Sequence, residues 1–335
     1  MAQPLQNVSI APVIPVFDQN SSEYAAIMVA IKYDHKRTAK IILNNPSSMI
    51  ISKLQEILVA VVITRPGWTD VIDQLFKVGA KPEMQNVNGD TILHVAFNNP
   101  TSYSIVDSLL KRYLSRSYLN LANFKGISIL HIACTRPDMD VIGQLLDANP
   151  PDAIHTKEES ELTPLHYAVM CDRLEVTNFL IQRGADIYEV DGNRSTPLHW
   201  ALYRRSVPII DLLLSMDSRK TNLTNVHGLS HFMAACAGSD ETVVEYFLLN
   251  GRSKDLVKNK VFNCDYFTDY TPLHFAVQLG RYKTVELLLH EKANCCASAY
   301  NNLTPHALAE FRGNKRIREL LQKHCLEKKG LKMIS

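Results

Sequence analysis

Apolar and polar positions alternate along the chain with the period of amphipathic helices, in short segments that come in pairs. Residues 24–31 predict one apolar helix and residues 37–43 a second. Residues 54–64 predict an inner helix, and residues 68–78 predict an outer helix that stops at Gly79, where a left-handed backbone is easily adopted. The same alternation continues towards the C-terminus, so the chain is expected to be a stack of helix pairs.

A six-residue pattern recurs at the start of the first helix in most of these pairs. Its best copies are Thr-Pro-Leu-His-x-Ala at residues 163–168, 196–201 and 271–276, where x is aromatic. The first residues of the seven copies are Thr91, Ser128, Thr163, Thr196, Ser230, Thr271 and Thr304. Successive copies therefore start 37, 35, 33, 34, 41 and 33 residues apart. A period of this length indicates a repeat protein in which each unit is one helix pair.

The hexapeptide and its period resemble the ankyrin repeat. The resemblance implies an all-α solenoid of about nine antiparallel helix pairs with short β-hairpin finger loops. The repeat domain is expected over residues 21–325, with N-terminal cap units at 22–80, an inserted loop at 252–265, and tails at 1–20 and 326–335, the second of which is basic. The recognisable repeats start at about residues 86, 123, 158, 191, 225, 266 and 299.

Each residue of the hexapeptide has a structural task. Thr supplies a hydroxyl that caps the first helix, and Pro occupies the first helical position, where no N–H is needed. The resemblance implies that the His is buried and ties one turn to the next through its ring nitrogens. The motif positions are Thr91, His94, His131, Thr163, His166, Thr196, His199, Thr271 and His274. The copy at 230–235 has His231 for Pro and Met233 for His, so it is expected to be a weak link in the array.

Composition narrows the class of protein further. Hydrophobic residues make up 46% of the 335 residues and charged residues 21%, as in globular proteins. The formal net charge of +2 does not favour a nucleic-acid partner. The longest apolar run, residues 57–63, is too short to span a bilayer, so no membrane insertion is expected. Seven scattered cysteines indicate a reducing compartment and a cytoplasmic protein, and the basic C-terminal tail leaves a nuclear location open.

No group of residues converges on a catalytic or metal site. The motif histidines occur once per repeat and are expected roughly 10 Å apart, whereas zinc ligands lie about 2 Å from one ion. His131 and Cys134 lie three residues apart on one helix, but no third group orients them. Cys295 and Cys296, near His306, are a weak metal or redox signal because no second cysteine pair accompanies them. We therefore expect no enzyme, no cofactor and no metal, and ordinary packing roles for these cysteines.

The binding surface is expected where the repeats differ from one another. In the ankyrin family, partners contact the fingers before each Thr and the exposed end of the first helix. Aromatic and Arg side chains in those places favour binding, because such residues are enriched at the energetic centres of interfaces. Packing of Phe124, Phe267 and Tyr270 against the next finger is an equally good interpretation. The candidate partner-binding residues are Phe124, Lys125, Arg136, Asn193, Tyr203, Arg204, Phe267, Tyr270, Gln278 and Tyr300.

The sequence thus favours a non-catalytic, monomeric scaffold or adaptor that binds another protein, with Tyr203 and Arg204 at the centre of a concave groove. One alternative is an inhibitor of Rel-type transcription factors, although the N-terminal tail has no paired-serine Asp-Ser-Gly degradation motif. Another is a substrate-recruiting subunit of a ubiquitin ligase, although few residues follow the last repeat for an F-box or SOCS-type box.

Overall fold

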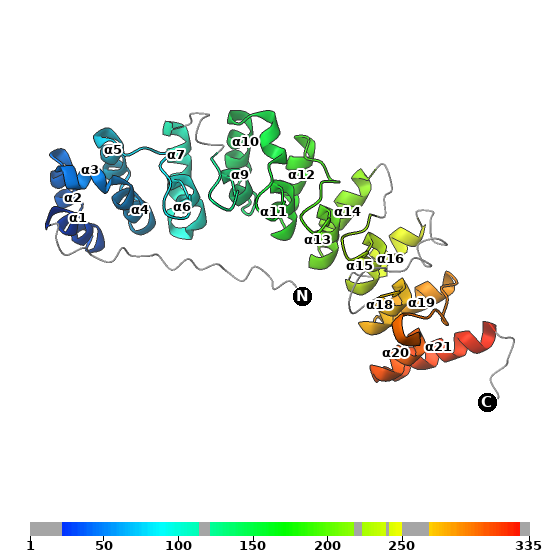
Figure 1. Cartoon of the computed structure of the whole chain (residues 1–335). Helices are drawn as coiled ribbons and strands as arrows, with labels where there is room; N and C mark the ends of the chain where they lie inside the picture. Colours follow the sequence, from blue (N-terminus) through cyan, green and yellow to red (C-terminus); the bar gives the residue numbers. More distant parts are fainter. Residues whose placement is uncertain (1–21, 114–120, 218–222, 239–240, 250–267, 329–335) are drawn as a thin grey trace. The chain divides into compact units, whose positions relative to one another are not determined.

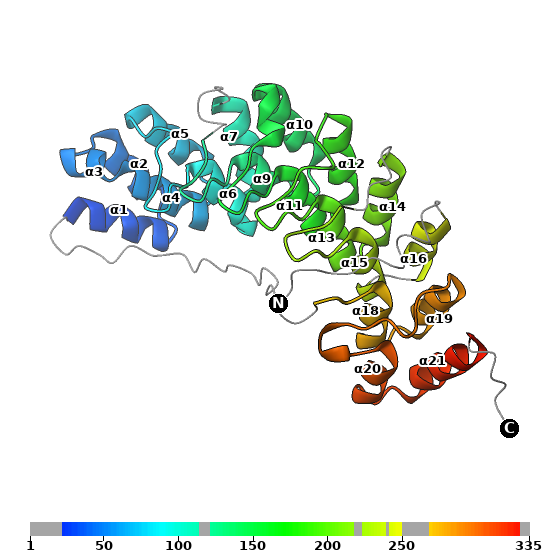
Figure 2. The same cartoon turned by 45° about the vertical axis from the view of Figure 1, so that its right-hand side comes forward.

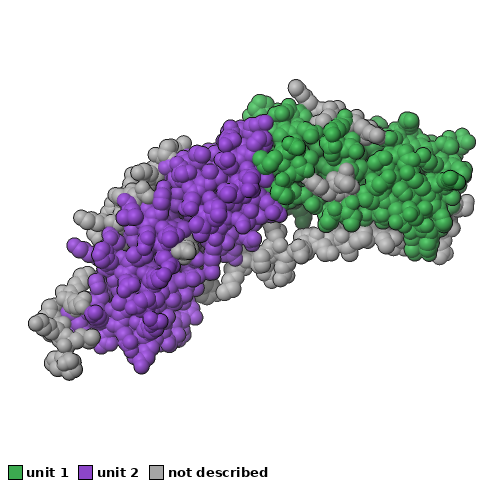
Figure 3. Space-filling model, turned by 180° about the vertical axis from the view of Figure 1, so that it is seen from behind, with its two compact units in different colours: residues 1–159 green, residues 160–335 purple. Residues whose placement is uncertain are grey.

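The computed structural model describes residues 22–113, 121–217, 223–238, 241–249 and 268–328. The chain divides into two compact units, residues 1–159 and residues 160–335, drawn in green and purple in Figure 3. Across the described ranges the secondary structure is helical, as the all-α prediction requires, and no residue lies in a β-strand. None of the helices in those ranges combines the length and apolar composition needed to cross a bilayer.

The first unit is built from helix pairs that stack side by side (Figure 1). Its elements are α1 (Ser22–Lys32), α2 (Lys36–Asn44), α3 (Ser48–Ser52), α4 (Leu54–Thr64), α5 (Thr69–Val78), α6 (Ile92–Asn98), η1 (Pro100–Ile105), α7 (Val106–Tyr113), α9 (Ile129–Ala133), α10 (Met139–Ala148) and η2 (Pro151–His155). Within pairs, α1 packs on α2, α4 on α5 and α9 on α10; between pairs, α1 packs on α4, α4 on α6 and α6 on α9. The apolar stripes of the first helices therefore form one continuous core.

The second unit repeats this arrangement more regularly (Figure 2). Its elements are α11 (Pro164–Met170), α12 (Leu174–Gln182), α13 (Pro197–Arg204), α14 (Val207–Met216), α15 (His231–Gly238), α16 (Glu241–Phe247), α18 (Pro272–Gln278), α19 (Tyr282–His290), η4 (Tyr300–Asn302), α20 (Pro305–Phe311) and α21 (Lys315–Lys328). The first helices α11, α13, α15, α18 and α20 stack in this order, and each packs against the second helix of its own pair. Since every pair buries its apolar face against a neighbour, stability is shared along the stack.

The helices predicted from the sequence are confirmed. Three details of the structure differ from the prediction, and two predicted segments lie outside the described residues. The short helix α3 was not predicted; Ser47 caps it by accepting the N–H of Ile50 at 3.4 Å. Helix α21 continues to Lys328, into the stretch expected to be a tail. In place of the expected finger hairpins, the described residues hold two isolated antiparallel bridges, Ala122 with Ser128 and Thr224 with Ser230. The predicted tail at 1–20 and the inserted loop at 252–265 lie outside the described residues.

The motif histidines take the structural role that the resemblance implied. In each case ring atom Nδ1 accepts the backbone N–H of the motif Thr or Ser, at 3.1 to 3.2 Å. In four repeats ring atom Nε2 contacts the carbonyl just before the next hexapeptide: His94 to Ile127 at 2.9 Å, His166 to Ser195 at 3.2 Å, His199 to Leu229 at 3.1 Å and His274 to Leu303 at 3.0 Å. These rings are buried, so each serves as a fixed link between consecutive turns.

Candidate partner-binding surface

Four of the seven fingers are tight turns that a side-chain oxygen holds from within. The Oδ1 atoms of Asn86, Asn123, Asp191 and Asn225 each accept the N–H groups two and four residues further on, at 2.7 to 3.1 Å. The fourth residue of the turn has positive φ in all seven fingers, at Gly89, Gly126, Glu161, Arg194, Gly228, Asp269 and Asn302. A short Asx side chain that bonds its own backbone is suited to this geometry. The turn therefore fixes the backbone locally, before any contact between fingers.

Neighbouring fingers are then joined through their backbones. The N–H of the second finger residue donates to a carbonyl of the preceding finger. In the first unit these bonds run from Phe124 to Asn88 at 3.1 Å and from Glu159 to Lys125 at 2.8 Å. In the second unit they run from Gly192 to Ser160 at 2.9 Å, Val226 to Asn193 at 2.9 Å and Tyr300 to Thr268 at 3.1 Å. The backbone of the second finger position is consequently held, and its side chain is presented at a defined place.

That second finger position carries exposed apolar side chains in both units. Their exposed fractions are 90% for Val87, 73% for Phe124, 41% for Val226 and 66% for Tyr300. Large apolar side chains in water are individually common, but four at one position of the repeat form a pattern, and the backbone N–H of Phe124, Val226 and Tyr300 is held by the preceding finger. Such a surface is ready to bind a partner without ordering its own backbone.

The ends of the first helices form the second row of exposed side chains. In the second unit this row contains Tyr203 at the end of α13, Leu279 after α18 and Phe311 at the end of α20, with exposed fractions of 61%, 52% and 82%. Arg204 is exposed beside Tyr203, whose ring meets that of Trp200 edge-on with centroids 6.2 Å apart. Aromatic and cationic groups therefore lie together on this row.

Several predicted site residues have partners within the repeat stack. The Nε atom of Arg312 donates to Oε1 of Gln278 at 3.2 Å, which links the ends of α20 and α18. The guanidinium of Arg136 is half-buried and donates to the carbonyl oxygen of Phe97. Lys125 and Asn193 are exposed finger residues. The roles of all four residues in binding stay predictions. Arg136 and Gln278 also make hydrogen bonds within the repeat stack.

Tyr270 was a candidate binding residue, but it is buried. Only 6% of this residue is exposed, because its ring packs against those of His274 and Phe275, with centroids 5.1 and 5.4 Å away. Burial also raises the pKa of its phenol above the usual value. Tyr270 thus packs within its own repeat, whereas Phe124 is exposed, and Phe267 lies outside the described residues.

The ankyrin frame places Val87, Val226, Leu279 and Phe311 on the finger and helix-end surface, but the shorter list of candidate binding residues left them out. All four occupy positions equivalent to predicted residues, Val87 and Val226 on the fingers and Leu279 and Phe311 at helix ends. Their repeat position was the available signal. The candidate binding residues were chosen by side-chain type. Exposure depends instead on whether the neighbouring repeat covers the position, which side-chain type does not reveal.

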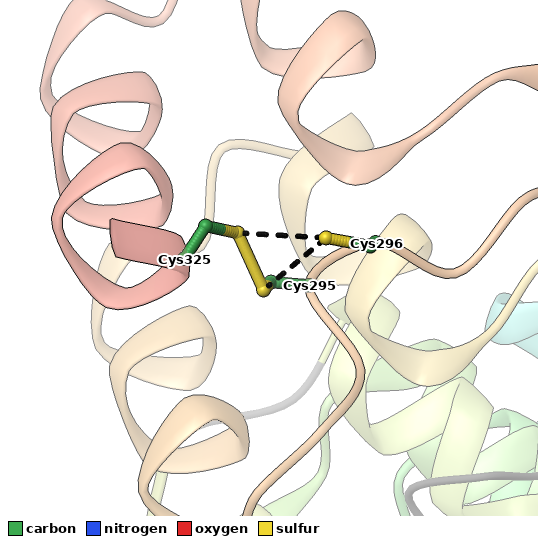
Figure 4. Close-up of side chains that lie close together, drawn as sticks. All are labelled: Cys295, Cys296 and Cys325. Atoms are coloured by element: carbon green, nitrogen blue, oxygen red, sulfur yellow. Dashed lines mark hydrogen bonds between the residues drawn. A yellow bond between two sulfur atoms is a disulfide. The ribbon is translucent and has the colours of Figure 1, made fainter. Parts of the chain in front are cut away.

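The cysteines near the C-terminus also differ from expectation. Cys295 is joined to Cys325 by a disulfide, and the free thiol of Cys296 lies beside it (Figure 4). His306 does not belong to the group of three sulfur atoms. The partner of Cys295 is 30 residues away on the last helix, so spacing along the sequence gave no indication of it.

Helix pairs in which a capping Thr or Ser and a buried His recur, with hydrogen-bonded loops between the pairs, define a protein of the helical-repeat class. A family model described as ankyrin repeats, three copies, matches residues 101–191, 130–225, 198–299 and 232–331. The chain therefore belongs to the ankyrin-repeat family, as the hexapeptide indicated. Ankyrin stacks are typically non-catalytic modules of protein–protein interaction.

Three curated relatives with different names each match about half of this chain or somewhat more. The chain is 26% identical over 204 residues to a palmitoyltransferase AKR1 of Lachancea kluyveri, covering 60% of this chain and 26% of that protein. It is 30% identical over 162 residues to the nuclear factor NF-kappa-B p105 subunit of Gallus gallus, covering 48% and 16%. It is 28% identical over 160 residues to a probable 26S proteasome regulatory subunit p28 of Saccharomyces cerevisiae, covering 48% and 70%. The chain thus spans about a quarter or less of the first two relatives.

Among solved structures, the chain is similar to one titled Bd0816 predatory endopeptidase from Bdellovibrio bacteriovorus in complex with immunity protein Bd3460. The match has a TM-score of 0.51 and 19% identity, and covers 58% of this chain and 96% of that chain. This likeness concerns the fold alone.

Proposed function

We propose that this protein is a non-catalytic scaffold or adaptor that binds another protein through the fingers and first-helix ends of its second unit. The observation that carries the proposal is the double row of exposed apolar side chains: Val226 and Tyr300 on the fingers, and Tyr203, Leu279 and Phe311 at the helix ends. When a partner covers such side chains and removes them from water, the free energy of the complex is lowered.

Two features favour tight binding over incidental exposure. The finger backbones are joined by hydrogen bonds, so little conformational entropy is lost when a partner is bound. Arg204 and Arg312, both exposed, lie one residue beyond Tyr203 and Phe311, and cations beside aromatic anchors suit a partner that presents apolar groups flanked by acidic ones. The partner's surface is therefore expected to combine apolar groups with acidic groups.

The location of the protein and its oligomeric state belong to the same proposal. A scaffold of this kind is expected to be a monomer, and the scattered cysteines favour the cytoplasm, with a nuclear fraction as the alternative. Imaging of the tagged chain in cells tests its location, and its mass by light scattering tests its oligomeric state.

The test compares partner capture by matched variants of the full chain. The binding variant combines Tyr203→Ala, Phe311→Ala and Tyr300→Ala, and the control variant carries Ile41→Ala, which removes an exposed apolar side chain from α2, the second helix of its pair. Affinity purification with mass spectrometry should recover the same partners with wild type and control. The binding variant should lose at least one specific partner while its circular dichroism and melting temperature are retained. If the folded binding variant keeps every partner, the surface assignment is wrong.

A second candidate is supported by the similarity to the p105 subunit named above. An inhibitor of Rel-type transcription factors would bind such a factor directly and lower its reporter activity, and it would do so through the same exposed rows. A reporter that does not respond to the protein, together with no direct binding, removes this candidate. A substrate-recruiting subunit of a ubiquitin ligase would instead bring a ligase scaffold into the purified complex.

A further inference from the structure

Three cysteine sulfur atoms from two distant parts of the chain meet at the C-terminal end of the stack (Figure 4). Cys295 and Cys296 lie in the turn after α19, and Cys325 lies in the last turn of α21. All three Sγ atoms lie within 4.8 Å of one another, and Sγ of Cys296 is 3.9 Å from each of the other two. Cys295 is buried, Cys325 is half-buried and Cys296 is exposed.

We propose that the reduced form of these three cysteines binds one thiophilic divalent cation of the zinc class. Sulfur ligands lie about 2.3 Å from zinc, so two sulfurs at corners of a tetrahedron around it are about 3.8 Å apart. The two distances that Cys296 makes, both 3.9 Å, agree with that edge. The side chains therefore already lie at metal-site spacing along two of the three edges.

The third edge depends on the redox state of the pair. Cys295 and Cys325 are joined by a disulfide, and in that state their sulfurs cannot both act as thiolate ligands. A phosphine reductant with one water converts the disulfide to two thiols and leaves a phosphine oxide. The three thiols then bind one divalent cation as thiolates and release three protons, which gives a site of net charge −1. The disulfide and the metal site are thus alternative states of the same residues.

The backbones that carry the thiols are held in place independently of the sulfur atoms. The Oδ1 atom of Asn294 accepts the N–H of Cys296 at 3.1 Å, and its carbonyl accepts the N–H of Ala297 at 3.0 Å. Helix α21 packs against both α19 and α20 through buried residues that include Ile317 and Leu321. Reduction of the disulfide therefore leaves the loop and the helix side by side, so the ligands remain preorganised.

The electrostatic surroundings favour a cation over free thiolates. Cys325 lies in the last turn of α21, where unpaired carbonyl groups carry partial negative charge. This field opposes a bare thiolate but stabilises a positive ion. Among the described residues, no other group of three or more Cys, His, Asp or Glu side chains lies close enough to hold a metal, and the exposure of Cys296 leaves the fourth corner to solvent.

A bound cation would attach the last helix of the array to the turn that precedes its own repeat. Terminal repeats have a neighbour on one side only, so they depend most on additional links. Binding to the folded state alone also raises its stability by mass action. The inference is independent of the partner-binding surface, which lies on other residues.

Cobalt(II) serves as the probe, because thiolate ligation gives it charge-transfer bands and tetrahedral ligation gives it strong visible bands. The full chain is reduced anaerobically with a phosphine and titrated with Co²⁺, then with Zn²⁺. The test variant is Cys296→Ala, which removes one ligand but keeps the Cys295–Cys325 pair. The matched control is Cys171→Ala, which also removes one free cysteine, here at the end of α11.

Reduced wild type and the Cys171→Ala control should bind one equivalent of Co²⁺ with thiolate bands, and Zn²⁺ should displace it. Cys296→Ala should bind at least about 100-fold more weakly, and the oxidised wild type should show no thiolate bands. The proposal is overturned if the reduced wild type gives no such bands. It is equally overturned if Cys296→Ala binds as tightly as wild type, or if the oxidised protein binds as well as the reduced one.

Discussion

The ring of His231 reaches back from the start of one repeat to the capping residue of the previous one. Its Nε2 atom lies 2.8 Å from Oγ1 of Thr196, and the centroid of its ring is 4.1 Å from that of His199. Oγ1 of Thr196 in turn lies 3.1 Å from Nδ1 of His199, whose Nε2 contacts the carbonyl of Leu229. Proline occupies the position of His231 in the best copies of the hexapeptide, so this departure from the motif adds a link between repeats.

Replacing His231 with the proline of the motif is therefore expected to destabilise the protein. The backbone N–H of His231 donates to the carbonyl of Leu223 at 3.2 Å, and proline would remove that bond together with the ring contact to Thr196. Two buried hydrogen bonds are worth about 2 kcal/mol together. Denaturant unfolding of His231→Pro should show a loss of about this size, beside an exposed control, Ser215→Ala, that is unchanged. A gain in stability for His231→Pro would contradict the assigned role.

Stability should also fall with acid, because His199 is buried in its neutral form. Burial, the largest cause, lowers the pKa of His199 from 6.5 to about 4. Nδ1 accepts the N–H of Thr196, so a proton there would face a donor and lose that bond. The unfolded state binds the proton first as the pH falls, so the stability is complete above about pH 6.5 and is lost between 6.5 and 4. His94 shifts in the same direction for the same reason.

The size of this effect follows from the linkage between pKa and stability. The shift of His199 corresponds to about 3 kcal/mol of unfolding free energy over that pH range. Urea unfolding at several pH values between 4 and 7 measures the slope. The variant His199→Asn should start less stable at pH 7 and show a clearly smaller slope. If wild type and variant have the same slope, the titration of His199 is not responsible.

The sequence predicted features that each repeat determines locally. Helix α4 begins and ends at the residues expected from its apolar pattern, and Gly79 ends α5 with a φ of 123°. The buried histidines were expected from the resemblance of the hexapeptide to the ankyrin repeat. The helix boundaries depend on residues within a few positions, so the apolar pattern is sufficient to reveal them.

The features that sequence reasoning did not find depend on contacts between repeats. Cys325 meets Cys295 only because α21 packs against α19. The link from His231 to Thr196 spans 35 residues in sequence. None of these contacts has a signature in local spacing, because each depends on how far one repeat turns relative to the next.

Two glycines with positive φ offer a matched test of how closely adjacent fingers approach. A Cβ built on Gly89, with φ +79°, would lie 2.5 Å from the backbone nitrogen of Phe124, whereas one on Gly184, with φ +98°, would meet nothing within 4 Å. Both Ala variants pay the conformational cost of positive φ, about 1 kcal/mol, but only Gly89→Ala must also displace the next finger. Denaturant unfolding should show Gly89→Ala to be more destabilised by at least about 1 kcal/mol. Equal losses would mean that the fingers separate easily.

Tyr270 and Phe311 should give opposite results in stability and binding. Tyr270 is buried between two aromatic rings, so Tyr270→Ala should lower the free energy of unfolding by about 3 kcal/mol. Phe311 is 82% exposed, so Phe311→Ala should change stability by less than about 0.5 kcal/mol and instead weaken partner binding roughly tenfold. Thermal unfolding and a binding titration against the purified partner measure the two quantities. A large loss of stability in Phe311→Ala would mean that its ring packs within the stack, and the row of helix ends would then lose its place in the binding surface.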